Sequence, residues 1–110
     1  MTTFGVELET IPVAGQEAGY KARVVRELQQ LGLTAESSWY SGRAYDRWQV
    51  KDDVSVTVCR NGQSHYGAEI VSPVLTMGDE SMAQVRQVCQ AIERAGGTVN
   101  INMKKHTTEN

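Results

Sequence analysis

The chain has 110 residues and a mass of 12.1 kDa, which is the size of one ordinary domain. Hydrophobic residues make up 40% and charged residues 22%, so the composition indicates a soluble globular protein and excludes a disordered or fibrous one. The 11 Lys+Arg and 13 Asp+Glu give a formal net charge of -2. Nonspecific nucleic-acid binders carry a basic excess, so this balance argues against that class. It leaves a protein partner open.

The sequence predicts neither a secretory signal nor a membrane span. Residues 1–4 lack a basic start and an apolar run, and no stretch approaches the roughly 18 apolar residues that a span requires. Cys59 and Cys89 are far apart, and a metal site would need Cys or His residues paired at short spacing. We therefore expect a cytoplasmic protein with two buried, reduced thiols.

The first half of the chain alternates between extended and helical patterns. Apolar and polar side chains alternate over residues 3–9, which places Glu7 and Glu9 on the polar side of a strand. Apolar residues then recur at helical spacing until Gly32 ends the pattern. The predicted elements are a strand over 3–9, a loop over 10–16, a helix over 17–31 and a short strand over 33–39.

The second half begins with a β-meander and returns to a helix. Asn61-Gly62 is a strong turn signal between extended patterns. Asp79 or Ser81 can cap the following helix, and Gly96-Gly97 ends it. The predicted elements are strands over 48–51, 54–59 and 66–72, a helix over 79–95, a strand over 98–103 and a loose polar tail over 104–110.

This order predicts an α+β fold with a single antiparallel or mixed sheet and two helices packed on one face. Each helix has one apolar stripe, which needs a sheet face to cover it. Residues 1–103 then form one domain, followed by the tail. The opposite sheet face carries polar side chains, namely Glu7, Glu9, Ser55 and Glu69, and it is where function should be sought.

Three predicted strands bring four acids to this open face: Glu7 and Glu9 on the first, Asp53 at the entry to the meander and Glu69 on its last strand. Carboxylates this close repel one another unless a positive charge joins them. A hard cation such as Mg²⁺ satisfies such a group, with phosphate oxygens and water completing its shell. The alternative is that these acids are simply solvated on an exposed sheet face.

Three segments of the chain resemble motifs of the amidoligase family, which belongs to the glutamine-synthetase-like carboxylate–amine ligases. The family's first strand reads F-G-V-E-x-E, as Phe4-Gly5-Val6-Glu7-Leu8-Glu9 does here. Residues 48–55 follow W-x-V-x-x-D-x-S, and residues 69–75 follow E-I-V-S-P-x-L. The segments occur in the family's order, and the similarity covers most of the chain.

The resemblance implies a partial glutamine-synthetase-like fold and an ATP- and Mg²⁺-dependent ligase that joins a carboxylate to an amine through an acyl-phosphate. In the family, acids on the sheet hold metal ions that bridge the ATP phosphates. Carried over by position, Glu7, Glu9 and Glu69 would be metal ligands. Asp53 would be a ligand or would position the amine.

The chain departs from the family after its second helix, where the family continues V-N-x-x-x-G-x-H-V-H. Val99-Asn100 begins this pattern and His106 matches its first His, but Lys104 replaces the Gly and Thr108 the second His. Family members are much longer, and their remaining part supplies basic phosphate contacts. Phosphoryl transfer depends on positioning, so we expect no catalysis by this chain alone.

The two histidines of the chain, His65 and His106, are not expected to be catalytic. His65, beside the turn, is expected to be an exposed loop residue, and His106 to be solvated in the tail. No Ser-His-Asp or Cys-His pairing is apparent.

One aromatic and basic cluster has the composition of an interface hot spot, although core packing explains part of it. Its members are Trp39, Tyr40, Arg43, Tyr45 and Arg47.

Two functions remain open. In the first, the chain is a catalytically incomplete amidoligase-like module that binds or inhibits another protein, for example a phage or mobile-element antagonist of a host system such as an anti-CRISPR. It then requires no cofactor. In the second, it is an ATP- and Mg²⁺-dependent ligase that is active only as an oligomer or with a second subunit. A free sheet edge makes a homodimer one further alternative.

Overall fold

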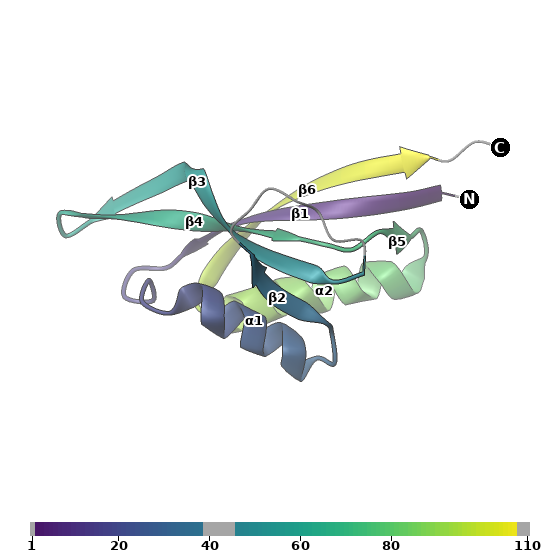
Figure 1. Cartoon of the computed structure of the whole chain (residues 1–110), viewed down its shortest axis with the longest axis horizontal. Coiled ribbons are helices and arrows are strands. Elements are labelled where there is room, and N and C mark those ends of the chain that lie inside the picture. Colours follow the sequence, from purple (N-terminus) through teal and green to yellow (C-terminus); the bar gives the residue numbers. More distant parts are fainter. Residues whose placement is uncertain (1, 39–45, 108–110) are drawn as a thin grey trace.

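The computed structural model describes the backbone of residues 2–38 and 46–107, and their side chains except those of Val54 and 101–107. Six strands and two helices lie within these described residues (Figure 1). In chain order they are β1 (Thr2–Pro12), α1 (Tyr20–Gln30), β2 (Ala35–Ser38), β3 (Trp48–Arg60), β4 (Gln63–Val71), β5 (Leu75–Thr76), α2 (Asp79–Arg94) and β6 (Gly97–Thr107).

The fold is α+β, with a mixed sheet and two helices, as the sequence predicts. The central strand β1 pairs antiparallel with β6 along its whole length, and with β4 and β5 at its other edge. β3 pairs antiparallel with β4 and parallel with β2, which makes the sheet mixed. Both helices lie on the same side of the sheet, and the far end of the β3–β4 hairpin projects beyond them (Figure 1).

The core lies between the sheet and the helices, and it follows from the two periodicities of the sequence. Alternate residues of β1 face the helices, whereas every third or fourth residue of each helix faces the sheet. Trp48 is 1% exposed and donates its indole N–H to Gln84 Oε1 of α2 at 3.2 Å. The largest buried apolar side chains are Phe4, Val6, Leu8, Tyr20, Val24, Leu28, Trp48, Val50, Ile70, Val88 and Ile92.

Four strands are longer than predicted, because long-range pairing extends them past their local signals. β4 begins at Gln63 instead of residue 66, since its first residues pair with β3. β1 continues through Pro12 and β6 through Thr107, since the two strands pair along their full lengths. The expectation of a loose tail from residue 104 is therefore wrong for 104–107. β3 is one strand rather than two, and a register shift between Asp53 and Thr57 marks the predicted break.

The two cysteines are free, but they are not both buried as predicted. Cys89 is half-buried on α2, and its burial raises the pKa of the thiol. Cys59 is exposed, because it lies in the part of the β3–β4 hairpin that extends past the helices (Figure 1). Neither helix in the described part of the chain is long and apolar enough to cross a membrane.

Two side-chain hydroxyls tie β1 to β4 at either end of their ladder. Ser72 Oγ accepts the Val6 N–H at 2.8 Å, and the Ser72 N–H donates to the Val6 carbonyl at 2.9 Å. At the other end, Thr10 Oγ1 donates to the Ala68 carbonyl at 2.9 Å and accepts the Tyr20 hydroxyl at 2.7 Å. These bonds fix the register of the two strands, and the bond from Tyr20 attaches α1 to β1.

We predict that Ser72→Ala destabilises the fold by about 1–3 kcal/mol, because it leaves the buried Val6 N–H without this acceptor. Urea denaturation monitored by tryptophan fluorescence measures the change. Ser64→Ala is the matched control, since Ser64 lies exposed on β4, the strand that Ser72 directly follows. An unchanged unfolding midpoint for Ser72→Ala would contradict this account of the serine.

Candidate functional site

The open face of the sheet carries acids from two neighbouring strands in adjacent positions. Glu9 of β1 lies directly opposite Glu69 of β4, and Glu69 lies opposite Lys51 of β3. Side chains opposed in this way have Cβ atoms about 5 Å apart. Glu7 lies on the same face one row further along β1, diagonal to Glu69. The structure therefore brings together three of the acids singled out from the sequence.

The environment of Glu69 raises the pKa of its carboxyl group. Burial is the largest cause, followed by the negative charges of Glu7 and Asp53 and a hydrogen bond with Glu7; the charge of Lys51 acts in the opposite direction. A hydrogen bond between two carboxyl groups requires a proton on one of them. The open face thus carries an excess of negative charge, which disfavours the ionised form of Glu69.

Asp53 has a structural role in addition to its charge. Its Oδ1 accepts the backbone N–H of Ser55 at 3.1 Å and also the Ser55 hydroxyl. This local turn lies where β3 departs from its register with β4. Asp53 still contributes to the potential at Glu69, so the D-x-S motif both shapes the strand and adds negative charge beside the acids.

Sequence reasoning missed Lys51 and Asn100, which lie in the same cross-strand row as Glu9 and Glu69. The alternation of β3 could have revealed Lys51, because Trp48 and Val50 face the core and the residue after Val50 must therefore face the acids. Asn100 was hidden because its row depends on the pairing of β6 with β1, which no local pattern specifies.

The donor chemistry of this face suits a hard divalent cation, since carboxylate oxygens are its preferred protein ligands. No group of three or more His, Cys, Asp or Glu side chains among the described residues is arranged to hold a metal by itself. Mg²⁺ commonly binds through one or two carboxylates together with substrate phosphates. The Glu7–Glu69 pair therefore fits a metal–phosphate complex better than a bare ion.

The predicted aromatic and basic interface falls mostly outside the described residues, which do not include Trp39, Tyr40, Arg43 or Tyr45. Arg47 is described, and it is engaged within the chain. Its Nε donates to Asp46 at 3.0 Å and its Nη1 to Glu36 at 3.2 Å. These bonds raise the pKa of Arg47, and its guanidinium lowers the pKa of Asp46.

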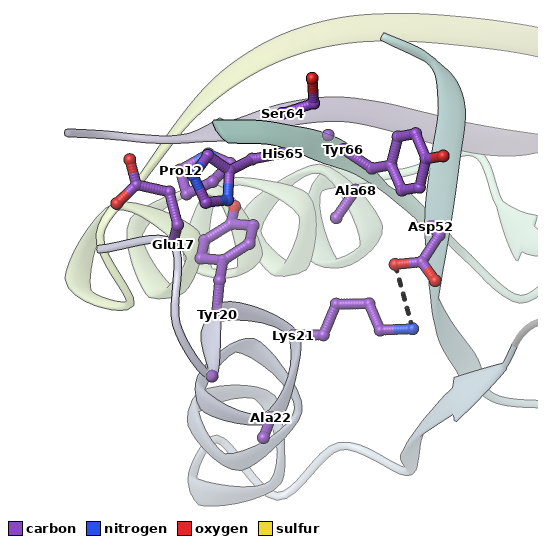
Figure 2. Close-up of a pocket in the computed structure, with 12 residues that line it drawn as sticks. Pro12, Glu17, Tyr20, Lys21, Ala22, Asp52, Ser64, His65, Tyr66 and Ala68 are labelled. Atoms are coloured by element: carbon purple, nitrogen blue, oxygen red, sulfur yellow. Dashed lines mark ion pairs between the residues drawn. The ribbon is translucent and has the colours of Figure 1, made fainter. Parts of the chain in front are cut away.

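A cavity of about 390 Å³ lies on the helix face, between the start of α1 and the β3–β4 hairpin (Figure 2). Lys21 Nζ forms an ion pair with Asp52 Oδ1 at 3.3 Å at one side of it. His65 lines the cavity from β4 and is half-buried, so the expectation of an exposed loop histidine is wrong. Asp52 lines this cavity, and it lies between Lys51 and Asp53 on β3. Because successive side chains of a strand point to opposite faces, the cavity lies on the other side of the sheet from the acids.

Comparison with known protein families decides the kinship of the chain. A family model described as "Putative amidoligase enzyme" matches residues 1–106. The chain belongs to this amidoligase family. Comparison with curated proteins finds no match. The amidoligase match includes all three sequence motifs, whose alternate residues build the core (Phe4, Val6, Trp48, Val50, Ile70) and the acid face (Glu7, Glu9, Glu69).

We predict that Glu69→Gln raises the free energy of unfolding at about pH 7. The folded protein raises the Glu69 pKa above its ordinary value of 4.5, so ionised Glu69 destabilises the fold at neutral pH. The gain should shrink as the pH falls through the folded pKa and vanish below 4.5, where Glu69 is protonated in both states. Thermal unfolding across this range measures it.

Glu80→Gln provides the control, because Glu80 is exposed in the first turn of α2 and distant from the acids. It should give no gain at any pH, since an acid at a helix N-terminus is favourable. A loss of stability in Glu69→Gln at neutral pH would show that the carboxylate is better compensated than we infer.

Proposed function

We propose that the chain supplies the acidic metal- and phosphate-binding face of an ATP- and Mg²⁺-dependent carboxylate–amine ligase with a partial glutamine-synthetase-like fold. The observation that carries the proposal is the hydrogen-bonded Glu7–Glu69 pair, with the Glu69 pKa raised and Glu9 directly opposite. Carboxylates whose mutual repulsion disfavours ionisation are suited to bind a divalent cation, because its charge relieves that repulsion.

The chain's own residues have distinct tasks in this proposal. Glu7 and Glu69 would hold the metal–nucleotide complex, and Glu9 and Asp53 would add to the negative potential that attracts it. Mg²⁺, when bound, neutralises phosphate charge and polarises the transferring group. Lys51 lies opposite Glu69, where its ammonium group limits the repulsion among the carboxylates before the complex binds.

We further propose that a second subunit completes the reaction, either another copy of this chain or a separately encoded protein. Phosphoryl transfer requires cationic groups placed around the phosphates. Among the side chains of the acid face that the structure describes, Glu7, Glu9, Asp53 and Glu69 outnumber Lys51. The complementary charges would come from the partner. The two free thiols suit a reducing cytoplasm, where ATP is also available.

The other function open from the sequence is that of a protein-binding or inhibitory module, including a phage-encoded antagonist of a host system. Four of the five residues on which it depends lie outside the described residues. The fifth, Arg47, is bonded to Asp46 and Glu36. This function stays a prediction, and the following experiment distinguishes it from the ligase proposal.

Isothermal titration of Mg-ATP into the purified chain tests the proposal. Wild type should bind, whereas Glu7→Gln and Glu69→Gln should weaken binding by about tenfold or more, since metal-binding groups commonly contribute 10–100-fold. Binding should release protons at pH values near the folded pKa of Glu69, because the metal competes with the proton for this carboxylate. Titrations in buffers of different ionisation enthalpy count these protons.

Glu80→Gln should bind Mg-ATP as the wild type does, and MgCl₂ alone should bind far more weakly than Mg-ATP. No heat from wild type would contradict the proposal. Capture of a protein partner that survives Glu7→Gln and Glu69→Gln, together with silence towards Mg-ATP, would favour the inhibitory module.

A further inference from the structure

A second cavity, of about 300 Å³, lies on the acid face beside Glu9. Two adjacent cross-strand pairs of β1 and β6 form its base, Glu9 with Asn100 and Ile11 with Thr98. The cavity is therefore continuous with the row that contains Glu69, and it lies across the sheet from the helix-face cavity of Figure 2.

Val56 of β3 forms a wall of this cavity, although β3 is not a neighbour of β1 in the sheet. The register shift after Asp53 brings Val56 over Gly67 of β4, where a Cβ would lie only 3.3 Å from the Val56 Cβ. The missing side chain at Gly67 thus lets Val56 reach across β4 towards Ile11. The glycine and the bulge together create the cavity.

The hairpin that carries Val56 is fixed to the rest of the chain at its far end. Arg60 donates to the Pro12 carbonyl and to Glu17 Oε2, the latter at 3.0 Å. The same bond lowers the pKa of Glu17, which keeps the pair ionised. Val56 is therefore held in place between two attachments, the Asp53–Ser55 turn and the Arg60 contacts.

We propose that this cavity binds a primary alkylammonium group, the amine co-substrate of the proposed ligase. Glu9 offers a carboxylate at the end nearest Glu69, and Asn100 a side-chain carbonyl beside it, both acceptors for an ammonium group. Ile11 and Val56 are half-buried and offer apolar contacts for a short aliphatic chain. The role of this ligand as a co-substrate rests on the proposed function, whereas the binding of an alkylammonium group to the cavity does not.

The charge distribution selects among ligands of this size. A carboxylate would be repelled by Glu9 and Glu69, so the carboxylate substrate does not suit this cavity. Free ammonia would satisfy Glu9 but would leave the apolar walls in contact with water. An amine with an aliphatic body uses both features, because it pairs its charge and buries its methylene groups.

Titration of ¹⁵N-labelled chain with n-butylamine at neutral pH, without Mg²⁺ or ATP, tests the proposal. The amide signals of Ile11, Val56 and Asn100 should shift saturably. Sodium butyrate should leave them in place, and ammonium chloride should bind more weakly than butylamine. Glu9→Gln should weaken butylamine binding about tenfold, as expected for the loss of a charged hydrogen-bond partner.

Val56→Ala should weaken butylamine binding severalfold while leaving ammonium binding unchanged, because it removes apolar contact alone. Val74→Ala is its matched control, since Val74 is exposed outside the cavity. Equal shifts with butyrate, an unchanged affinity in Glu9→Gln, or shifts confined to Lys21 and Tyr66 would overturn the proposal.

The two proposals fail separately. Silence towards Mg-ATP with intact butylamine binding would remove the ligase function and leave an amine-binding cavity. Intact Mg-ATP binding without butylamine shifts would remove the cavity proposal and leave the metal and phosphate face.

Discussion

The register between β1 and β4 determines where every acid of the open face lies. Ser72 bonds to Val6 at one end of the ladder and Thr10 to Ala68 at the other. Because side chains alternate along a strand, a slip of one residue would turn Glu7 and Glu9 into the core. The burial of Phe4, Val6 and Leu8 opposes the same slip. The same strand register therefore both buries the apolar residues of β1 and places the acids on the open face.

The acid face combines two environments that oppose each other. Partial burial strengthens the repulsion between Glu69 and its acidic neighbours, whereas the charge of Lys51 opposes it. A fully solvated row of glutamates would have no reason to retain a proton, and a fully buried row could not remain ionised. The face lies between these limits, so its charge state can respond to the arrival of a cation.

Alternation made the acid face predictable, because one local pattern assigns Phe4, Val6 and Leu8 to the core and Glu7 and Glu9 to the other side. The class of fold followed from the two helical stripes in the same way. Pairing partners were not predictable, since the extension of β6 to Thr107 and the position of Asn100 depend on contacts with β1. The bulge in β3 was not predicted either. The sequence indicated a metal ligand at Asp53 and an exposed strand residue at Ser55. In the structure these two residues are hydrogen-bonded to each other where β3 changes its register with β4, and Val56 then lies over Gly67.

The β3–β4 hairpin extends past the helices (Figure 1). It supplies one wall of the cavity beside Glu9, whose base belongs to β1 and β6. Val56 is absent from the buried core cluster, so exchanging it for a larger or smaller residue disturbs few contacts on which folding depends. At the proposed amine-binding cavity, ligand preference would therefore be separable from thermodynamic stability. A lineage could alter the molecules it accepts through changes in the hairpin and still inherit the same scaffold.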